Sequence, residues 1–115
     1  LFEGSFRRNY LHVRDAADVF LFAIEHPEQL LKQQIFNVGL SSANLTKREL
    51  CEKIQKYVPE FVWHEAMVGV DSDKRDYVVS NARIEATGWK PTYSLDDGIV
   101  ELIKLYQMPF ESYRN

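Results

Sequence analysis

The sequence predicts an α/β or α+β domain in which short strands alternate with about four helices. The chain has 115 residues, the length of one domain. Its apolar runs are short and end at glycine, proline or polar residues, as strands and helices of small domains do. Several segments open with capping signals, and the expected order is β-α-β-α-β-β-α-α. This order alone does not choose between the two classes.

The first strand and helix are expected between residues 6 and 26. Residues 6–13 are rich in aromatic and branched side chains, which is typical of a short strand. Asp15 is then expected to cap a helix that ends at His26, because Pro27 disfavours helical geometry in the residue before it. The predicted apolar stripe of this helix consists of Ala16, Val19, Phe20, Ala23 and Ile24.

The second strand and helix are expected between residues 34 and 58. Residues 34–39 form a compact apolar run that ends in glycine, which indicates a buried strand. A polar loop over residues 41–44 follows. Thr46 and Glu49 then match a capping box, so we predict a helix that begins there and ends before Pro59.

Between residues 61 and 88 the patterns are weaker. Residues 61–70 are strand-like, the charged stretch up to residue 76 is expected to be a loop, and residues 77–79 could form a brief strand. Ser80 is expected to cap a short helix that closes at Gly88, a residue suited to a left-handed stop.

The last helix is expected to open at Ser94 and to end at Pro109. Its predicted apolar stripe consists of Leu95, Ile99, Leu102, Ile103 and Tyr106. Residues 111–115 show no pattern and are expected to be a disordered tail. The predicted domain therefore covers residues 1–110.

Composition and net charge limit the classes of function that this protein can have. The net charge is −3, which argues against a general nucleic-acid binder using Arg7, Arg8 and Tyr10. No apolar run approaches the ~20 residues of a membrane helix, and no signal peptide is visible, so a reducing cytoplasm is expected. Cys51 is the single cysteine, which excludes an internal disulfide and predicts an inert, half-buried thiol. We expect no metal site, since His64-Glu65 lacks the second histidine of a zinc motif.

Two arginines lie in segments where their side chains could bind a phosphate group. Arg8 lies in the first predicted strand, and Arg75 lies in the charged loop. A guanidinium can bind a phosphate through two parallel hydrogen bonds. The alternatives are a surface role for Arg8 and neutralisation of Arg75 by acidic neighbours, with Lys74 as the substitute if the register differs by one.

Several blocks of this sequence resemble the extended short-chain dehydrogenase/reductase family, the NAD-dependent sugar-nucleotide epimerases and dehydratases. They occur in the family's order and near its spacing. The blocks are Arg8-Asn9-Tyr10-Leu11-His12-Val13-Arg14-Asp15, Phe36-Asn37-Val38-Gly39, Asn44-Leu45-Thr46-Lys47-Arg48-Glu49-Leu50, Lys74-Arg75-Asp76-Tyr77, Ser80-Asn81-Ala82-Arg83-Ile84, Gly88-Trp89-Lys90-Pro91 and Ser94-Leu95-Asp96-Asp97-Gly98-Ile99. Arg75 is followed directly by Asp76, a departure from the Arg-x-x-Asp of many epimerases that leans toward the dehydratases.

The resemblance implies the C-terminal, substrate-binding portion of a Rossmann-type enzyme, with a strand and helix that complete the Rossmann domain. It implies that Arg8 and Arg75 contact the diphosphate of a nucleotide sugar. Asn44 could hydrogen-bond the substrate or merely turn the chain before Thr46. NAD or NADP would be bound mainly by an N-terminal half, and the parent protein would be a homodimer.

Catalytic residues of that family are missing from this sequence. It contains no Gly-rich dinucleotide loop and no Tyr-x-x-x-Lys pair. We therefore expect no turnover by the chain alone and assign no catalytic residue. His12 is interpreted as a structural histidine and Trp89 as a core residue.

Without its cofactor half, the chain is expected to expose apolar surface, including the predicted strand over residues 35–38. The alternative is a free-standing, non-catalytic module that senses nucleotides or binds another protein. A Gly-rich turn and a Tyr-x-x-x-Lys pair encoded upstream of Leu1 would distinguish the two.

Overall fold

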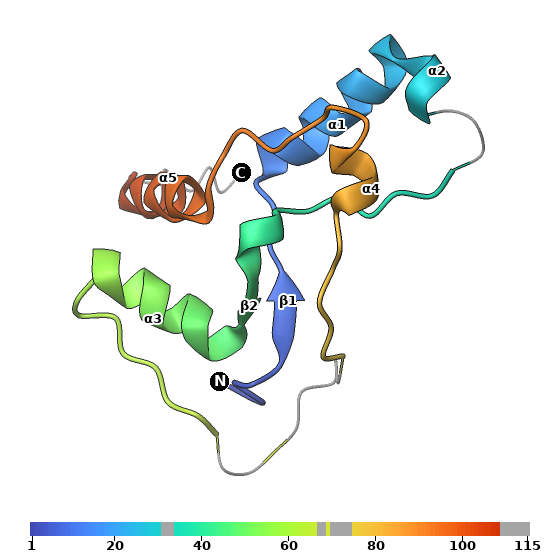
Figure 1. Ribbon diagram of the computed structural model, residues 1–115. Helices are drawn as coiled ribbons and strands as arrows, with labels where there is room; N and C mark the ends of the chain where they lie inside the picture. Colours follow the sequence, from blue (N-terminus) through green and yellow to red (C-terminus); the bar gives the residue numbers. More distant parts are fainter. Residues whose placement is uncertain (31–33, 67–68, 70–74, 109–115) are drawn as a thin grey trace, which may run out of the picture.

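The protein contains a small two-stranded sheet with helices on two sides (Figure 1), as seen in a computed structural model that describes residues 1–30, 34–66, 69 and 75–108. Strand β1 (Arg7–Asn9) pairs antiparallel with β2 (Asn44–Thr46), and Arg8 lies opposite Leu45. The predicted combination of short strands and helices is confirmed.

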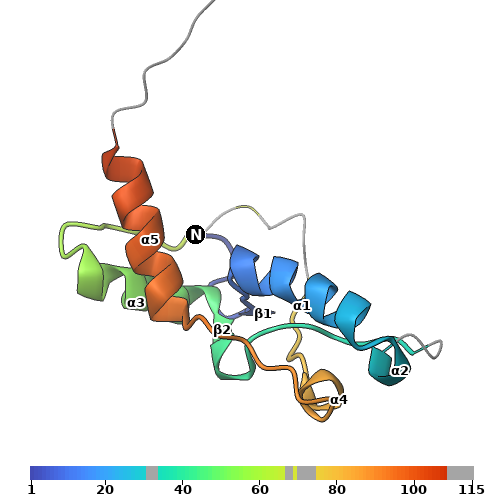
Figure 2. The ribbon, with the colours of Figure 1, turned by 90° about the horizontal axis from the view of Figure 1, so that it is seen from above.

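Within the described residues, five α-helical segments and one 3₁₀ turn surround this sheet. They are α1 (Val13–Glu25), α2 (Pro27–Leu30), η1 (Ser41–Ala43), α3 (Lys47–Tyr57), α4 (Ala82–Glu85) and α5 (Leu95–Gln107). Helices α3 and α5 lie side by side, while α1, α2 and α4 gather on the other side of the molecule (Figure 2).

Helix α3 begins at the predicted capping box, and α5 begins after Ser94, where it was expected to open. The Thr46 hydroxyl accepts a hydrogen bond from the Glu49 amide at 3.1 Å, and the Glu49 carboxylate accepts one from the Thr46 amide at 2.7 Å. Ser94 and Asp97 form the same arrangement at 3.1 and 2.8 Å. The hydrogen bonds that the two carboxylates accept, from the amide and hydroxyl of Thr46 and from the hydroxyl and amide of Ser94, lower the pKa of Glu49 and of Asp97.

Helix α1 begins differently from the prediction. His12 is its N-cap, and its Nδ1 accepts a hydrogen bond from the Arg14 amide at 3.1 Å. Asp15 lies inside the first turn, and its carboxylate accepts hydrogen bonds from the amides of Thr92 and Tyr93. The prediction that Asp15 caps α1 is wrong, because this carboxylate binds a segment distant in sequence. The helix ends at Glu25, before Pro27, as predicted.

The strand predictions were only partly correct. Residues 34–39 and 61–66 are not strands, and the remaining residues of the predicted 61–70 strand, except Gly69, lie outside the described residues. Residues 77–79 do not form a strand either, whereas the predicted loop residue Asn44 begins β2. A β-strand forms only where a second segment supplies the paired backbone hydrogen bonds. The local sequence does not show which segment that is.

The short fourth helix starts one residue later than predicted, and its stop is confirmed. Asn81, rather than Ser80, is the N-cap of α4. Gly88 follows the helix with φ at 95°, a left-handed conformation that glycine adopts without steric cost.

The core lies between α1, α4 and the extended residues 34–38. Val19, Ile84 and Trp89 are buried there, which confirms the core role of Trp89. Half-buried side chains pack around them, namely Leu11, Phe22, Ala23, Phe36 and Val38. The predicted stripe of α1 was wrong for Phe20 and Ile24, which are each 72% exposed.

Cys51 is a half-buried free thiol, as predicted, and burial raises its pKa. Among the described residues, no helix is long and apolar enough to cross a membrane. The same part of the chain holds no group of three or more His, Cys, Asp or Glu residues arranged to bind a metal ion. The predicted tail over residues 111–115 lies outside the described residues.

Candidate functional site

The structure brings the two predicted arginines into contact. Arg8 extends from β1, and its Nη1 donates hydrogen bonds to the Arg75 carbonyl oxygen and, at 2.8 Å, to the Arg7 carbonyl oxygen. Its guanidinium carbon lies 5.3 Å from the centre of the Tyr77 ring, a cation–π distance. Residues 67 positions apart in the sequence therefore share one surface.

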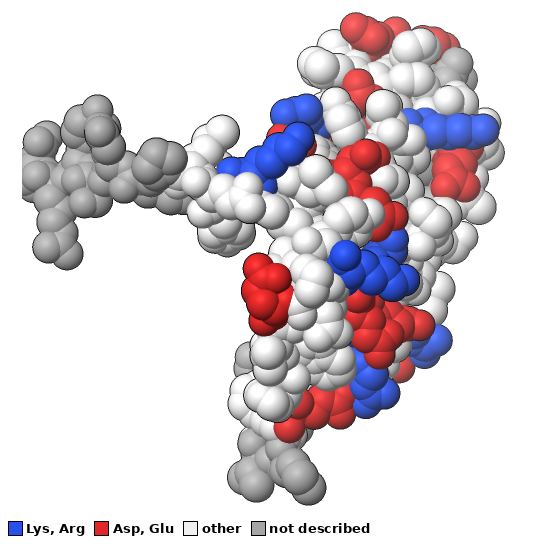
Figure 3. All heavy atoms as spheres, turned by 90° about the vertical axis from the view of Figure 1, so that its left-hand side faces the viewer, with Lys and Arg blue, Asp and Glu red and all other residues white. Residues whose placement is uncertain are grey.

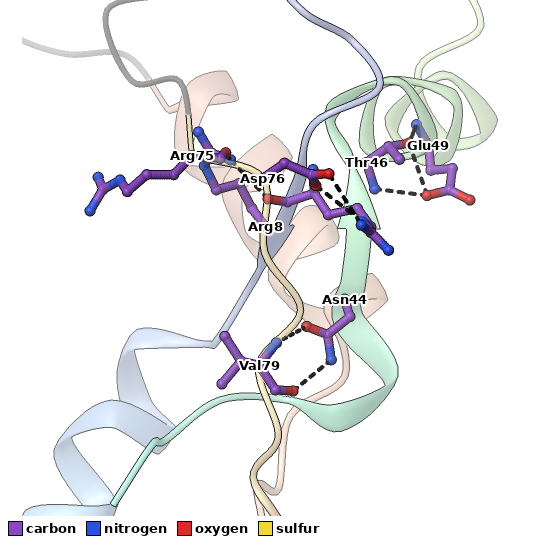
Figure 4. Close-up of polar contacts among 8 residues, drawn as sticks. Arg8, Asn44, Thr46, Glu49, Arg75, Asp76 and Val79 are labelled. Carbon is purple, nitrogen blue, oxygen red and sulfur yellow. Dashed lines mark hydrogen bonds and ion pairs between the residues drawn. The ribbon is translucent and has the colours of Figure 1, made fainter.

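Arg75 contributes to this contact through its backbone. Its side chain is exposed and extends away from Asp76 and Asn44 (Figure 4). The guanidinium is thus accessible to a ligand that reaches this surface. Lys74, the substitute for Arg75 in the sequence prediction, lies outside the described residues.

Asp76 binds Arg7 in a two-pronged ion pair. Arg7 Nε and Nη2 donate to the two carboxylate oxygens of Asp76 at 3.0 and 3.1 Å, and the Arg7 amide donates to Oδ1 at 2.9 Å. No local sequence pattern indicates this pair, because its members are 69 residues apart. Arg7 is therefore a salt-bridge partner of Asp76.

The ion pair lowers the pKa of Asp76. Hydrogen bonds from the Arg7 side chain and amide lower its pKa from 3.8 to about 2. A carboxyl group with a depressed folded-state pKa contributes to stability above its ordinary pKa and loses that contribution as the pH falls through the lowered value. The Arg7–Asp76 pair is therefore ionised throughout the neutral range.

Asn44 joins β2 to the chain after Arg75. Its Nδ2 donates to the Val79 carbonyl oxygen at 3.0 Å, and its Oδ1 accepts from the Val79 amide at 2.9 Å (Figure 4). The side chain thus pairs with a backbone as a neighbouring strand would. A direct contact of Asn44 with substrate remains a prediction, and these two hydrogen bonds would compete with it.

His12 has the structural role that the sequence favoured. With Nδ1 accepting the Arg14 amide, the ring proton resides on Nε2, which lies 3.0 Å from Glu101 Oε2. The imidazole also stacks on Tyr93, with ring centres 4.5 Å apart. These contacts fix the start of α1 against α5.

The surface that carries Arg8 and Arg75 has side chains suited to binding an oxyanion. Guanidinium groups donate in a planar fork that matches phosphate oxygens. Charge elsewhere is mixed: on the face shown in Figure 3, acidic and basic side chains alternate without a broad patch of one sign. Phosphate recognition here would therefore be local to the arginines.

The described residues do not provide a cradle for a dinucleotide cofactor. Such a cradle needs a Gly-rich turn between a strand and the start of a helix. The link from β1 to α1 is Tyr10-Leu11-His12, and β2 leads directly into α3 at Lys47. Neither junction contains glycine, so these residues do not fit the pyrophosphate of NAD or NADP.

Comparison with known proteins identifies relatives of one kind. A family model described as the NAD dependent epimerase/dehydratase family matches residues 1–39. The probable GDP-L-fucose synthase 1 of Oryza sativa subsp. japonica is 34% identical over 110 residues, which cover 90% of this chain and 30% of the rice protein. The dTDP-4-dehydro-6-deoxyglucose reductase of Escherichia coli is 29% identical over 103 residues, which cover 85% of this chain and 30% of that enzyme.

A solved structure shares the fold. It is a crystal structure of a GDP-D-glycero-L-gluco-heptose synthase from Campylobacter jejuni, determined in the presence of NADPH. The match has a TM-score of 0.69 and 20% sequence identity, and it covers 91% of this chain and 31% of the enzyme. The chain thus spans about 30% of the length of the curated relatives that it matches.

Proposed function

Because the chain belongs to the NAD-dependent epimerase/dehydratase family, we propose that it is the C-terminal, substrate-binding part of an enzyme acting on a nucleotide sugar. The contact between Arg8 and Arg75 supports this proposal most directly, because it places two guanidinium-bearing residues on one surface. In this proposal both arginines bind the diphosphate of the substrate. Binding at a group remote from the reacting carbons positions the sugar for chemistry.

The chemistry itself would belong to the rest of the parent enzyme. A nicotinamide cofactor supplies hydride transfer in such enzymes, and in this proposal the rest of the parent enzyme binds most of it. We propose that the chain alone binds and orients substrate without turnover.

Arg8→Ala and Arg75→Ala are each expected to weaken diphosphate binding about ten- to a hundredfold. A hydrogen bond to a charged group contributes about 1.5–3 kcal/mol, and about 1.4 kcal/mol corresponds to a factor of ten. The measurement is a titration of the chain with UDP, dTDP, GDP and CDP, and with the matching nucleosides, followed by amide shifts. Nucleoside affinity should change little in either variant.

Arg83→Ala is the matched control for this titration. Arg83 is also exposed, but it lies on α4 and donates to Gln34. It should bind the diphosphate like the unaltered chain. Equal diphosphate affinity in the Arg8→Ala, Arg75→Ala and Arg83→Ala variants would contradict the proposed function.

Exposed apolar surface supports the proposal that another part of the polypeptide covers this chain. Val13, Phe20 and Ile24 are 72–77% exposed along α1, and Ile35 is 84% exposed. A groove of about 670 Å³ lies between the start of α1 and helices α3 and α5. Its apolar lining includes Leu50, Ile54, Leu95, Ile99, Leu102 and Leu105. An apolar groove and exposed apolar side chains of this kind are typical of an interaction site.

The chain alone is therefore expected to self-associate and to bind an apolar dye. Phe20→Gln combined with Ile24→Gln should reduce both effects without loss of stability, because these side chains are largely exposed and contribute little to the core. Sedimentation velocity and dye fluorescence provide the measurement. A monomeric chain without excess dye binding would favour the free-standing module.

A further inference from the structure

Residues 75–79 run beside the two-stranded sheet without being part of it. None of them belongs to a helix or strand. Figure 1 shows this stretch passing along β1 toward α4. A backbone without a ladder depends on side chains to hold its position. The contacts of this segment therefore decide where Arg75 lies relative to Arg8.

The N-terminal end of the segment is held by an ion pair. Asp76 follows Arg75 directly and receives three hydrogen bonds from Arg7, two from the guanidinium and one from the amide. Both side chains remain partly exposed, at 48% for Arg7 and 39% for Asp76. Arg8 donates to the carbonyl oxygen of Arg75 from the same strand.

The C-terminal end of the segment is held by the side-chain amide of Asn44. Asn44, at the start of β2, forms two hydrogen bonds with the backbone of Val79. Both attachments originate in the sheet, since Arg7 belongs to β1 and Asn44 to β2. The segment is thus attached at both ends to the two-stranded sheet that carries Arg8.

We infer that Arg7 and Asp76 are positioning residues, whose ion pair sets Arg75 at the distance from Arg8 that a diphosphate requires. This inference rests on the proposed function. It assigns the ion pair no direct contact with the ligand. The ion pair acts on Arg75 indirectly, by holding the backbone next to it in place.

A single substitution would not distinguish an effect of the position of Arg75 on binding from an effect of the altered net charge. Removal of Asp76 alone leaves an additional positive charge beside the arginines, which strengthens anion binding. Removal of Arg7 alone has the opposite effect. The double variant Arg7→Ala/Asp76→Ala leaves the net charge unchanged. A change in diphosphate binding in this variant therefore reflects a change in the position of Arg75.

A second exposed ion pair offers a matched control. Arg48 and Glu65 lie 2.6 Å apart, with side-chain exposures of 47% and 40%, nearly those of Arg7 and Asp76. This pair joins α3 to residues 61–66 and touches neither Arg8 nor Arg75 in the contacts described. The control is Arg48→Ala/Glu65→Ala.

The experiment compares the affinity of UDP, dTDP, GDP and CDP with that of each matching nucleoside. Arg7→Ala/Asp76→Ala should lower the ratio of diphosphate to nucleoside affinity about two- to fivefold, the range of an exposed ion pair. Partial unfolding would lower both affinities equally and leave the ratio unchanged. Amide hydrogen exchange, which needs no ligand, should accelerate at residues 75–79 in this variant and not in the control.

The outcomes separate the two proposals. A lower ratio and faster exchange in Arg7→Ala/Asp76→Ala, with an unaltered control, support the positioning role. An unchanged ratio, while Arg8→Ala still weakens diphosphate binding, overturns the positioning role and leaves the proposed function intact. If Arg8→Ala and Arg75→Ala bind diphosphate normally, the proposed function fails, and the positioning role fails with it.

Discussion

Trp89→Ala is expected to lower the free energy of unfolding by about 3–5 kcal/mol, the usual cost of removing a large buried aromatic side chain. The Trp89 side chain is 3% exposed and packs in the core with Val19 and Ile84. Its indole nitrogen also donates to Asp18 Oδ2 at 2.8 Å. Since small domains are stable by only about 5–15 kcal/mol, this variant should be close to unfolding at physiological temperature.

Urea denaturation followed by far-ultraviolet circular dichroism measures this loss. Trp63→Ala is the control, because Trp63 is the other tryptophan and is only half-buried. It should cost clearly less than Trp89→Ala. Trp89→Phe keeps most of the apolar volume and isolates the loss of the hydrogen bond to Asp18, so an intermediate value is expected. Equal stability of Trp89→Ala and Trp63→Ala would contradict the observed core.

Asp15→Ala is expected to destabilise the fold by about 2–4 kcal/mol. The carboxylate of Asp15 is 1% exposed and accepts hydrogen bonds from the Thr92 and Tyr93 amides at 2.9 and 3.0 Å. Hydrogen bonds to a charged group contribute about 1.5–3 kcal/mol each, and the substitution leaves both amides without an acceptor. The carboxylate therefore holds the chain before α5 against α1.

The same denaturation experiment tests this expectation. Glu25→Ala provides the comparison, because Glu25 is an exposed acidic residue at the end of the same helix. Its substitution should change stability by less than about 0.5 kcal/mol. Asp15→Asn keeps one acceptor but presents an amide donor to the other backbone amide, so it should also be destabilising. If Asp15→Ala were as stable as Glu25→Ala, the bonds to Thr92 and Tyr93 would not stabilise the fold.

Features of this protein that depend on neighbours in sequence were predictable from the sequence. The capping boxes at Thr46 and Ser94 join residues three positions apart, and both helices begin there. The stop of α1 before Pro27 and the left-handed Gly88 follow from the backbone limits of single residues. The blocks that revealed the family are likewise short and local.

Features that join distant segments were decided by the tertiary structure. Asp15 has the sequence position of a cap, yet it binds a backbone 77 residues away. Residues 34–39 have the composition of a strand but find no ladder partner among the described residues, whereas residues 44–46 find one in β1.

The candidate site shows the same division. The sequence identified Arg8 and Arg75 as candidates for binding phosphate, but only the fold placed them together and paired Arg7 with Asp76. Capping and turn preferences act within a few bonds of the backbone and are written in adjacent residues. Ladders, buried carboxylates and ion pairs each need two segments that only the folded chain brings into contact.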